Sequence, residues 1–317
     1  MAGTRRADGM DNNQQIAVIG GGLMGHGIAL TFARAGQYVA VTDPNEDMLR
    51  SVPARISESL KLLGATDVEI AKALKKIELF STVKGAVKDA QFVFEAAPEK
   101  LALKQSIFAE VEAHAPPAAV LASNTSVIQI TKIMGELESR HRALGTHWWN
   151  PPHMIPLVEV VKTEWTDAKL ADHMVDLLAD AGKTPVLVEK DVPGFIGNRL
   201  QHALWREAVS LVANGVCSAQ AVDDVVKASF GRRLAVLGPL ENADLVGIEL
   251  TQDIHDQVLF DLEASPTPSS YLQSLLDQGR TGMAAGAGFR EWRTEDLARV
   301  KARVADHLKK LEAILPD

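Results

Sequence analysis

His147 and Glu159 are the two side chains whose types and positions most suggest proton transfer. His147 follows a predicted strand over 142–146, and Glu159 interrupts the next apolar strand, 157–161. A carboxylate inside an apolar strand needs a cationic or hydrogen-bonding partner, because burying it alone is costly. If one nitrogen of His147 is that partner, the other nitrogen is free to take a proton from a hydroxyl group. Taken singly, each residue could equally be structural.

A glycine-rich segment, GGGLMG over 20–25, is suited to binding phosphates. It follows a short apolar strand over 16–19 and opens a helical pattern. The first glycine permits a tight turn, the third lets the backbone approach a pyrophosphate, and the last lets the helix pack closely on the strand. The helix N-terminus adds free N–H groups and a positive dipole end. The residues expected at the phosphates are Gly20, Gly22, Leu23, Met24 and Gly25.

Asp43 ends the second strand of this pattern. A carboxylate at this position accepts hydrogen bonds from an adenosine ribose and repels a 2′-phosphate. Strand, glycine loop, helix, strand and Asp43 together predict NAD rather than NADP as the cofactor. The alternative is a glycine-rich turn in another kind of α/β domain.

Two further polar segments accompany these motifs, SNTS over 123–126 and PGFIGNR over 193–199. SNTS follows a predicted strand, at the edge of the sheet where such folds bind ligands. It could be only a helix cap, and Asn198 could merely cap the next helix. In chain order with His147 and Glu159, however, they indicate alcohol oxidation, in which a base takes the hydroxyl proton while a hydride passes to a nicotinamide.

These residues must be positioned by short apolar strands that alternate with helical patterns, which predicts a mainly parallel sheet with helices on both faces. Strands are expected over 16–19, up to Asp43, and over 92–96, 120–122, 142–146, 157–161 and 184–188, and helices over 46–63, 67–76, 101–114, 127–135 and 167–181. Beyond a Pro-Gly boundary at 191–194 the patterns are helical, over 195–214, 218–229, 239–262, 267–277 and 294–314.

The expected fold is therefore α/β, with a flexible tail over 1–15, an N-terminal Rossmann domain over 16–192 and an all-α domain over 193–317. An apolar face on the helical domain is expected to bury in a homodimer. The net charge of −8, without a basic stripe, argues against nucleic acid. No segment predicts a membrane span, a secretory signal or a metal site, and Cys217 is the only cysteine, so a cytoplasmic protein is expected.

The chain resembles the L-3-hydroxyacyl-CoA dehydrogenase family over nearly its whole length. The motifs that carry the resemblance are IAVIGGGLMGHGIA, VFEAAPEKLALK, ASNTS, GTHWWNPP, LVEVV, DVPGFIGNR and GRTGMAAGAGF. The resemblance implies that His147 is the catalytic base, that Glu159 is its partner, and that Ser126 and Asn198 hold the substrate. It also implies a cleft between two domains and dimerisation through the helices. Residues implied near the NAD are Ala97, Glu99, Lys104, Asn124 and Asn150, and Trp149 is implied near the substrate.

Some departures from the family pattern point away from a CoA substrate. A phenylalanine pair usual in the family is Trp148-Trp149 here, and 53–80 looks shorter and less basic than in members that grip CoA. The stretch 231–241 is more similar to branches that act on small free hydroxy acids, L-gulonate 3-dehydrogenase (lambda-crystallin) and carnitine dehydrogenase. The WWNPPH segment is similar to the branch that oxidises a pyridine carboxylate.

The expected reaction is oxidation of the secondary hydroxyl of a 3-hydroxy acid, or of its CoA thioester, by NAD+. Arg233, beside Arg232, suits a free carboxylate because its fork binds both oxygens, although both side chains could simply be solvated. One alternative is a dehydrogenase of a heteroaromatic carboxylate alcohol or aldehyde. Another is a non-catalytic, crystallin-like structural protein, against which the complete set of His, Glu, Ser and Asn speaks.

Overall fold

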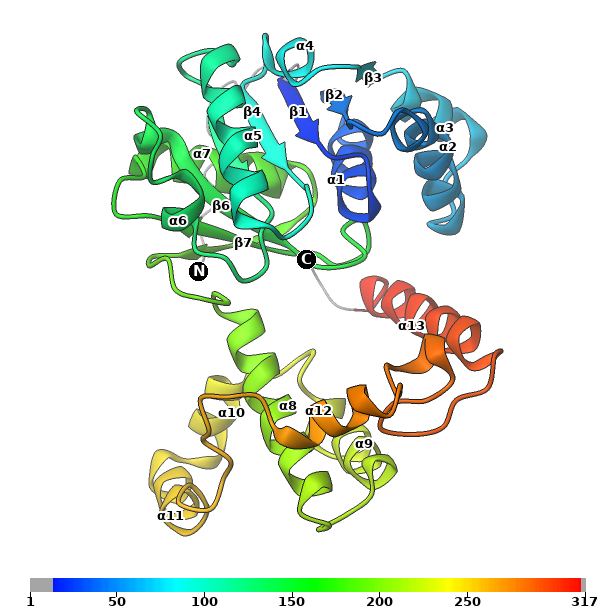
Figure 1. Cartoon of the computed structure of the whole chain (residues 1–317), viewed down its shortest axis with the longest axis vertical. Coiled ribbons are helices and arrows are strands. Elements are labelled where there is room, and N and C mark those ends of the chain that lie inside the picture. Colours follow the sequence, from blue (N-terminus) through cyan, green and yellow to red (C-terminus); the bar gives the residue numbers. More distant parts are fainter. Residues whose placement is uncertain (1–13, 315–317) are drawn as a thin grey trace. The chain divides into compact units, whose positions relative to one another are not determined.

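The computed structural model describes residues 14–314, and the chain divides into two compact units between Arg199 and Leu200 (Figure 1). Of the tail predicted over 1–15, residues 1–13 lie outside the described part, and Gln15 already belongs to the first strand. The first unit is an α/β layer structure and the second is helical, which confirms the predicted fold class.

One eight-stranded sheet forms the first unit, in the order β3-β2-β1-β4-β5-β6-β7-β8. Every neighbouring pair is parallel except β6 and β7, which are antiparallel. The strand order reverses between β1 and β4, and ligands of such sheets bind at the carboxyl ends beside this point. The strands are β1 Gln15–Ile19, β2 Tyr38–Thr42, β3 Ile77–Phe80, β4 Phe92–Glu95, β5 Val120–Ser123, β6 Ala143–Trp148, β7 Leu157–Lys162 and β8 Thr184–Val188.

Helices pack on both faces of this sheet, so its central strands are buried on both sides. Along β1, Ile16 and Val18 join one hydrophobic cluster and Ala17 and Ile19 join the other, as alternation along a strand requires. The helices of this unit are α1 Leu23–Arg34, α2 Glu46–Leu62, α3 Asp67–Leu74, α4 Val83–Val87, α5 Leu101–His114, α6 Ile130–Met134 and α7 Ala168–Asp180.

The helices of the second unit are α8 Gly197–Ala213, which begins in the first unit, α9 Ala219–Ala228, α10 Pro239–Val246, α11 Ile248–Val258, α12 Ser270–Asp277 and α13 Asp296–Glu312. The single helix predicted over 239–262 is wrong, because Gly247 breaks it with a φ of 102°. Among the described hydrophobic side chains of this unit, only Leu275 is buried.

Candidate active site

The glycine loop between β1 and α1 has the shape that a dinucleotide needs. Gly20 has a φ of 103°, and a Cβ placed on Gly25 would lie 1.7 Å from the Gly20 carbonyl oxygen, so side chains are excluded from both positions. A Cβ on Gly22 meets no described atom within 4 Å, so the loop is open on that side. Gly22 caps α1 without a side-chain hydrogen bond, which leaves the N–H groups at Leu23 and Met24 suited to a phosphate.

Asp43 is fixed beside this loop, at the end of β2. Its Oδ2 accepts a hydrogen bond from the Gly21 amide at 2.8 Å, and its Oδ1 accepts one from the Asn45 amide at 2.8 Å. Each carboxylate oxygen has a second lone pair, so both can still accept a ribose hydroxyl. Arg55 of α2, which the sequence did not single out, donates to the Gly21 carbonyl at 2.8 Å.

His147 and Glu159 are directly paired residues of the antiparallel strands β6 and β7. Directly opposite residues point to the same face of a sheet, so the register brings the two side chains together. Nδ1 of His147 lies 2.7 Å from Oε2 of Glu159, and both side chains are buried. The rings of Trp149 and Phe195 flank the imidazole, with centroids 5.2 and 5.7 Å away.

The second oxygen of Glu159 holds the start of helix α8. Oε1 accepts hydrogen bonds from the Ile196 amide at 2.8 Å and from the Gly197 amide at 3.0 Å. Burial raises the pKa of Glu159, but the hydrogen bonds from His147, Gly197 and Ile196 outweigh it and hold the pKa below its ordinary value. The carboxylate is therefore ionised at neutral pH, as a partner for an imidazolium must be.

Ser126 follows β5 and has an exposed side chain. Its carbonyl oxygen accepts a hydrogen bond from Nδ2 of Asn198 at 2.8 Å, which ties this loop to the first turn of α8. In the same loop, Oδ1 of Asn124 accepts from the Trp148 amide at 3.0 Å. The structure thus brings Ser126, Asn198, His147 and Glu159 together through α8.

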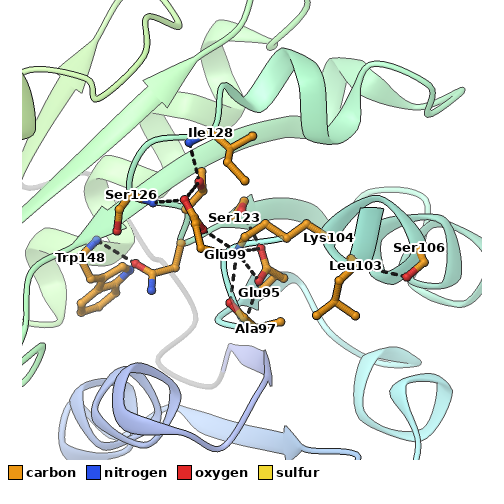
Figure 2. A network of polar contacts seen from close by, with 12 residues as sticks. Glu95, Ala97, Glu99, Leu103, Lys104, Ser106, Ser123, Ser126, Ile128 and Trp148 are labelled. Atoms are coloured by element: carbon orange, nitrogen blue, oxygen red, sulfur yellow. Dashed lines mark hydrogen bonds and ion pairs between the residues drawn. The ribbon is translucent and has the colours of Figure 1, made fainter. Parts of the chain in front are cut away.

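Lys104, which is buried, and Glu99, which is exposed, belong to one polar network at the ends of β4 and β5, which Figure 2 shows together with Ala97. The network also contains Glu95, which sequence reasoning missed. A charged residue at the end of an otherwise apolar strand was the available signal for it.

Three other predicted residues have different surroundings. Trp149 packs on Gly197, where a Cβ would lie 2.4 Å from its Cζ2 atom. Asn150 is exposed and follows β6, before a cis bond to Pro151. Arg233 is exposed in the second unit, after a short 3-10 helix over Phe230–Arg232, and its carboxylate-binding role stays a prediction.

Residues 14–314 contain no cluster of His, Cys, Asp and Glu that could hold a metal, and none of their helices meets the length and hydropathy that a membrane span requires.

Family models match both units of the chain. The NAD-binding domain of 3-hydroxyacyl-CoA dehydrogenase matches residues 15–192, and the C-terminal domain of the same enzyme matches residues 194–292. The first match confirms the predicted NAD cofactor. Together, the two matches confirm the resemblance inferred from the sequence motifs.

The similar proteins act on different substrates. A 5-formyl-3-hydroxy-2-methylpyridine 4-carboxylate 5-dehydrogenase from Mesorhizobium japonicum is 31% identical, over 95% of this chain and 97% of the relative. L-carnitine dehydrogenase from Streptomyces griseus is 39% identical over 74% and 70% of the two chains. Mitochondrial hydroxyacyl-coenzyme A dehydrogenase from Rattus norvegicus is 34% identical over 88% and 91%.

A solved structure is similar over almost the whole chain. It is a 5-formyl-3-hydroxy-2-methylpyridine 4-carboxylic acid 5-dehydrogenase, described as an NAD+-dependent dismutase. The TM-score is 0.87 at 30% identity, over 95% of this chain and 98% of the other.

Proposed function

This chain belongs to the 3-hydroxyacyl-CoA dehydrogenase family and is an NAD-dependent dehydrogenase, and from that premise we propose that the pair His147–Glu159 removes the proton from a secondary hydroxyl of a 3-hydroxy acid or its CoA thioester. The observation that carries the proposal is the buried contact of 2.7 Å between Nδ1 of His147 and Oε2 of Glu159. It fixes the imidazole orientation and leaves Nε2 as the nitrogen that accepts the substrate proton.

NAD+, when bound, supplies the hydride acceptor. As the hydroxyl proton passes to Nε2 of His147, the ring becomes positive, and the ionised Glu159 stabilises that charge. The hydroxyl of Ser126 hydrogen-bonds the substrate oxygen, and Asn198 holds both the substrate and the Ser126 carbonyl. The residues that we place at the NAD are Gly20, Gly22, Leu23, Met24, Gly25, Asp43, Ala97, Glu99, Lys104, Asn124 and Asn150.

NADH formation at 340 nm with a substrate panel tests this function. The panel contains 3-hydroxybutyrate, L-carnitine and 3-hydroxybutyryl-CoA, each with NAD+. We expect turnover of at least one hydroxyl substrate by the parent chain and loss of that turnover in His147→Gln. If Arg233 binds a free carboxylate, Arg233→Met raises KM for the free acid about 10- to 100-fold and leaves the thioester unaffected. Turnover that survives in His147→Gln contradicts the assigned base.

A second candidate is a dehydrogenase of a heteroaromatic carboxylate alcohol or aldehyde. The TM-score of 0.87 with an enzyme of this substrate class favours it, as do the aromatic rings of Trp149 and Phe195 close to His147. The base would then take a proton from a hydroxyl of the hydrated aldehyde. A pyridine aldehyde in the panel separates the candidates, because it alone yields an acid.

We propose that a second copy of the chain covers the helices of the second unit. Large apolar side chains are exposed there, including Leu240 at 81%, Leu245 at 73% and Phe260 at 83%. With Leu275 the only described hydrophobic side chain that is buried in this unit, the unit lacks a core large enough to stabilise it alone. A cytoplasmic location stays a proposal, supported by the single cysteine.

A further inference from the structure

Three fully buried polar side chains meet at the carboxyl edge of the sheet. Glu95 ends β4 and Ser123 ends β5, and the two are paired residues of these neighbouring strands. Lys104 reaches them from the first turn of α5. Figure 2 shows the Lys104 side chain extending toward Glu95. An ion pair with no solvent exposure has to satisfy its hydrogen bonds internally, because each charge loses its hydration.

Both carboxylate oxygens of Glu95 accept hydrogen bonds from buried donors. Oε1 accepts from the Ala97 amide at 2.6 Å and from Nζ of Lys104 at 2.7 Å. Oε2 accepts from the Ser123 hydroxyl at 2.6 Å and from the same ammonium at 3.0 Å. Glu95 is therefore the principal counter-charge of Lys104.

Glu99 is a second carboxylate within reach of the same ammonium. Its Oε2 lies 3.4 Å from Nζ of Lys104, farther than either oxygen of Glu95. Its Oε1 accepts instead from the Thr125 hydroxyl at 2.5 Å and from the amides of Ser126 and Val127 at 3.0 and 3.1 Å. Burial raises the pKa of Glu99, but these hydrogen bonds and Lys104 outweigh it and lower the pKa.

We propose that Glu95 is a positioning residue, whose charge satisfies Lys104 and thereby leaves Glu99 to hold the loop that carries Ser126. Without the charge of Glu95, Glu99 is the carboxylate that remains within reach of the buried Lys104 ammonium. Because a buried ammonium without a close counter-charge is costly, Glu99 moves onto Lys104 and releases the loop amides. Only the consequence for catalysis rests on the proposed function, through the role of Ser126.

Glu95→Gln removes the charge and keeps the shape. The Gln amide oxygen can still accept from the Ala97 amide, and its NH2 group can donate to Ser123. The readout is hydrogen exchange of the peptide containing the Ser126 and Val127 amides, which needs neither substrate nor cofactor. We expect protection of this peptide to fall about tenfold or more in Glu95→Gln, the effect of losing hydrogen bonds to a charged group. The peptide of strand β7 serves as the internal control and keeps its protection.

Removal of Lys104 as well provides the decisive comparison. In Glu95→Gln/Lys104→Met no ammonium competes for Glu99, so we expect the Ser126 peptide to recover to within about twofold of Lys104→Met alone. This comparison also holds if the single Glu95→Gln chain fails to fold. Titration of Glu95→Gln with ADP-ribose, the part of NAD expected at the glycine loop, should give the Kd of the parent chain, because Glu95 is not among the residues placed at the NAD. Unchanged protection in Glu95→Gln, no recovery in the double variant, or a parallel loss of ADP-ribose binding and β7 protection each overturns the proposal.

The proposed function fails by different observations. If the parent chain forms no NADH with any substrate of the panel, the catalytic assignment is wrong, while the exchange result for the Ser126 peptide stands. Conversely, if the parent chain is catalytically active but the protection of the Ser126 peptide is unchanged in Glu95→Gln, only the positioning role of Glu95 is wrong.

Discussion

At the scale of single residues, the assignments depend on charges that the fold has fixed in place. Glu159 has one oxygen on His147 and the other on the amides of Ile196 and Gly197. Asp43 is held in a comparable way by the Gly21 and Asn45 amides. Neither carboxylate can turn away without giving up hydrogen bonds, so both are pre-organised for their proposed roles.

Replacing either member of the dyad tests the base. His147→Gln is expected to lower kcat by about 10²–10⁴, the usual contribution of a positioned general base. Glu159→Gln is expected to be similarly severe, because the amide can accept the α8 hydrogen bonds but cannot stabilise an imidazolium. Steady-state NADH formation measures both, with the exposed His141→Gln as the matched control. Near-parental kcat in either dyad variant contradicts the assignment.

Asp43 is expected to determine the choice of cofactor. The parent chain should have a much higher kcat/KM with NAD+ than with NADP+, because the carboxylate repels a 2′-phosphate. Asp43→Asn removes the charge, so the ratio of the two kcat/KM values is expected to fall about tenfold or more. Equal kcat/KM for both cofactors in the parent chain would refute this role.

At the scale of elements, most of the sheet could be predicted, because its strands are short apolar runs separated by Gly, Pro and helical patterns. The structure adds β3 and α4, which the sequence pattern did not reveal. β3 is an edge strand of four residues without a fully buried side chain, and α4 is one short turn. Gly247 was also misjudged, because a glycine inside a helical pattern does not by itself predict the positive φ that splits the helix.

The parts of the candidate site that a local sequence motif encodes could be predicted, whereas contacts with partners distant in the chain could not. The glycine loop and the charge of Glu159 inside an apolar strand were visible in the sequence. The hydrogen bonds that the Ile196 and Gly197 amides donate to Glu159 were not visible, because they depend on how the start of α8 meets β7. Glu95 was missed for another reason: Lys104 follows it by only nine residues, but the two side chains meet only because α5 packs against the end of β4.

The start of α8 is expected to be intolerant of added volume. A Cβ on Gly197 would lie 2.4 Å from Trp149, so Gly197→Ala must displace the indole or the helix. We expect a loss of about 1–3 kcal/mol in the free energy of unfolding, as for overpacked cores, and a lower kcat because the Gly197 amide holds Glu159. Gly238→Ala is the control, because a Cβ there meets no described atom within 4 Å. Equal unfolding free energies in urea for the two variants contradict the packing argument.

The loop between β6 and β7 packs on α1, since a Cβ on Gly27 would lie 2.4 Å from Pro152 and 3.2 Å from Nδ1 of His153. This packing is expected to weaken in acid. Burial lowers the pKa of His153 to about 4, with the positive charges of His26 and Lys183 adding to the effect. A histidine with a lowered pKa takes up its proton more readily in the unfolded chain, so stability is complete above pH 6.5 and is lost as the pH falls toward 4.

Substitution of His153 checks this expectation. His153→Gln should reduce the loss of unfolding free energy between pH 7 and pH 5 by about 1–2 kcal/mol. Urea unfolding at the two pH values measures it, with His141→Gln as the exposed control. The same pH dependence in His153→Gln and in the parent chain would mean that other groups cause the acid instability.

At the scale of the whole molecule, the two units differ in how they are stabilised. The first has hydrophobic clusters on both faces of its sheet, whereas the helices of the second leave large apolar side chains exposed. Sedimentation equilibrium at micromolar concentration is expected to give twice the chain mass of 34.2 kDa. Phe260→Glu should weaken this association, whereas Leu62→Glu, an equally apolar exposed position in the first unit, should not. A monomeric parent chain would refute the dimer.

The direction of β7 has a consequence for how this site can change. β6 and β7 form the only antiparallel pair of the sheet within the described residues, and His147 and Glu159 face each other through its register. Side chains alternate between the two faces of a strand, so a slip of one residue turns Glu159 to the opposite face. Extra length in the connecting loop leaves the pairing intact, because the strand hydrogen bonds set it. Changes in that loop can therefore alter which substrate binds beside His147 without affecting its pairing with Glu159. A change in strand register, in contrast, removes Glu159 from His147 completely, because no intermediate register exists.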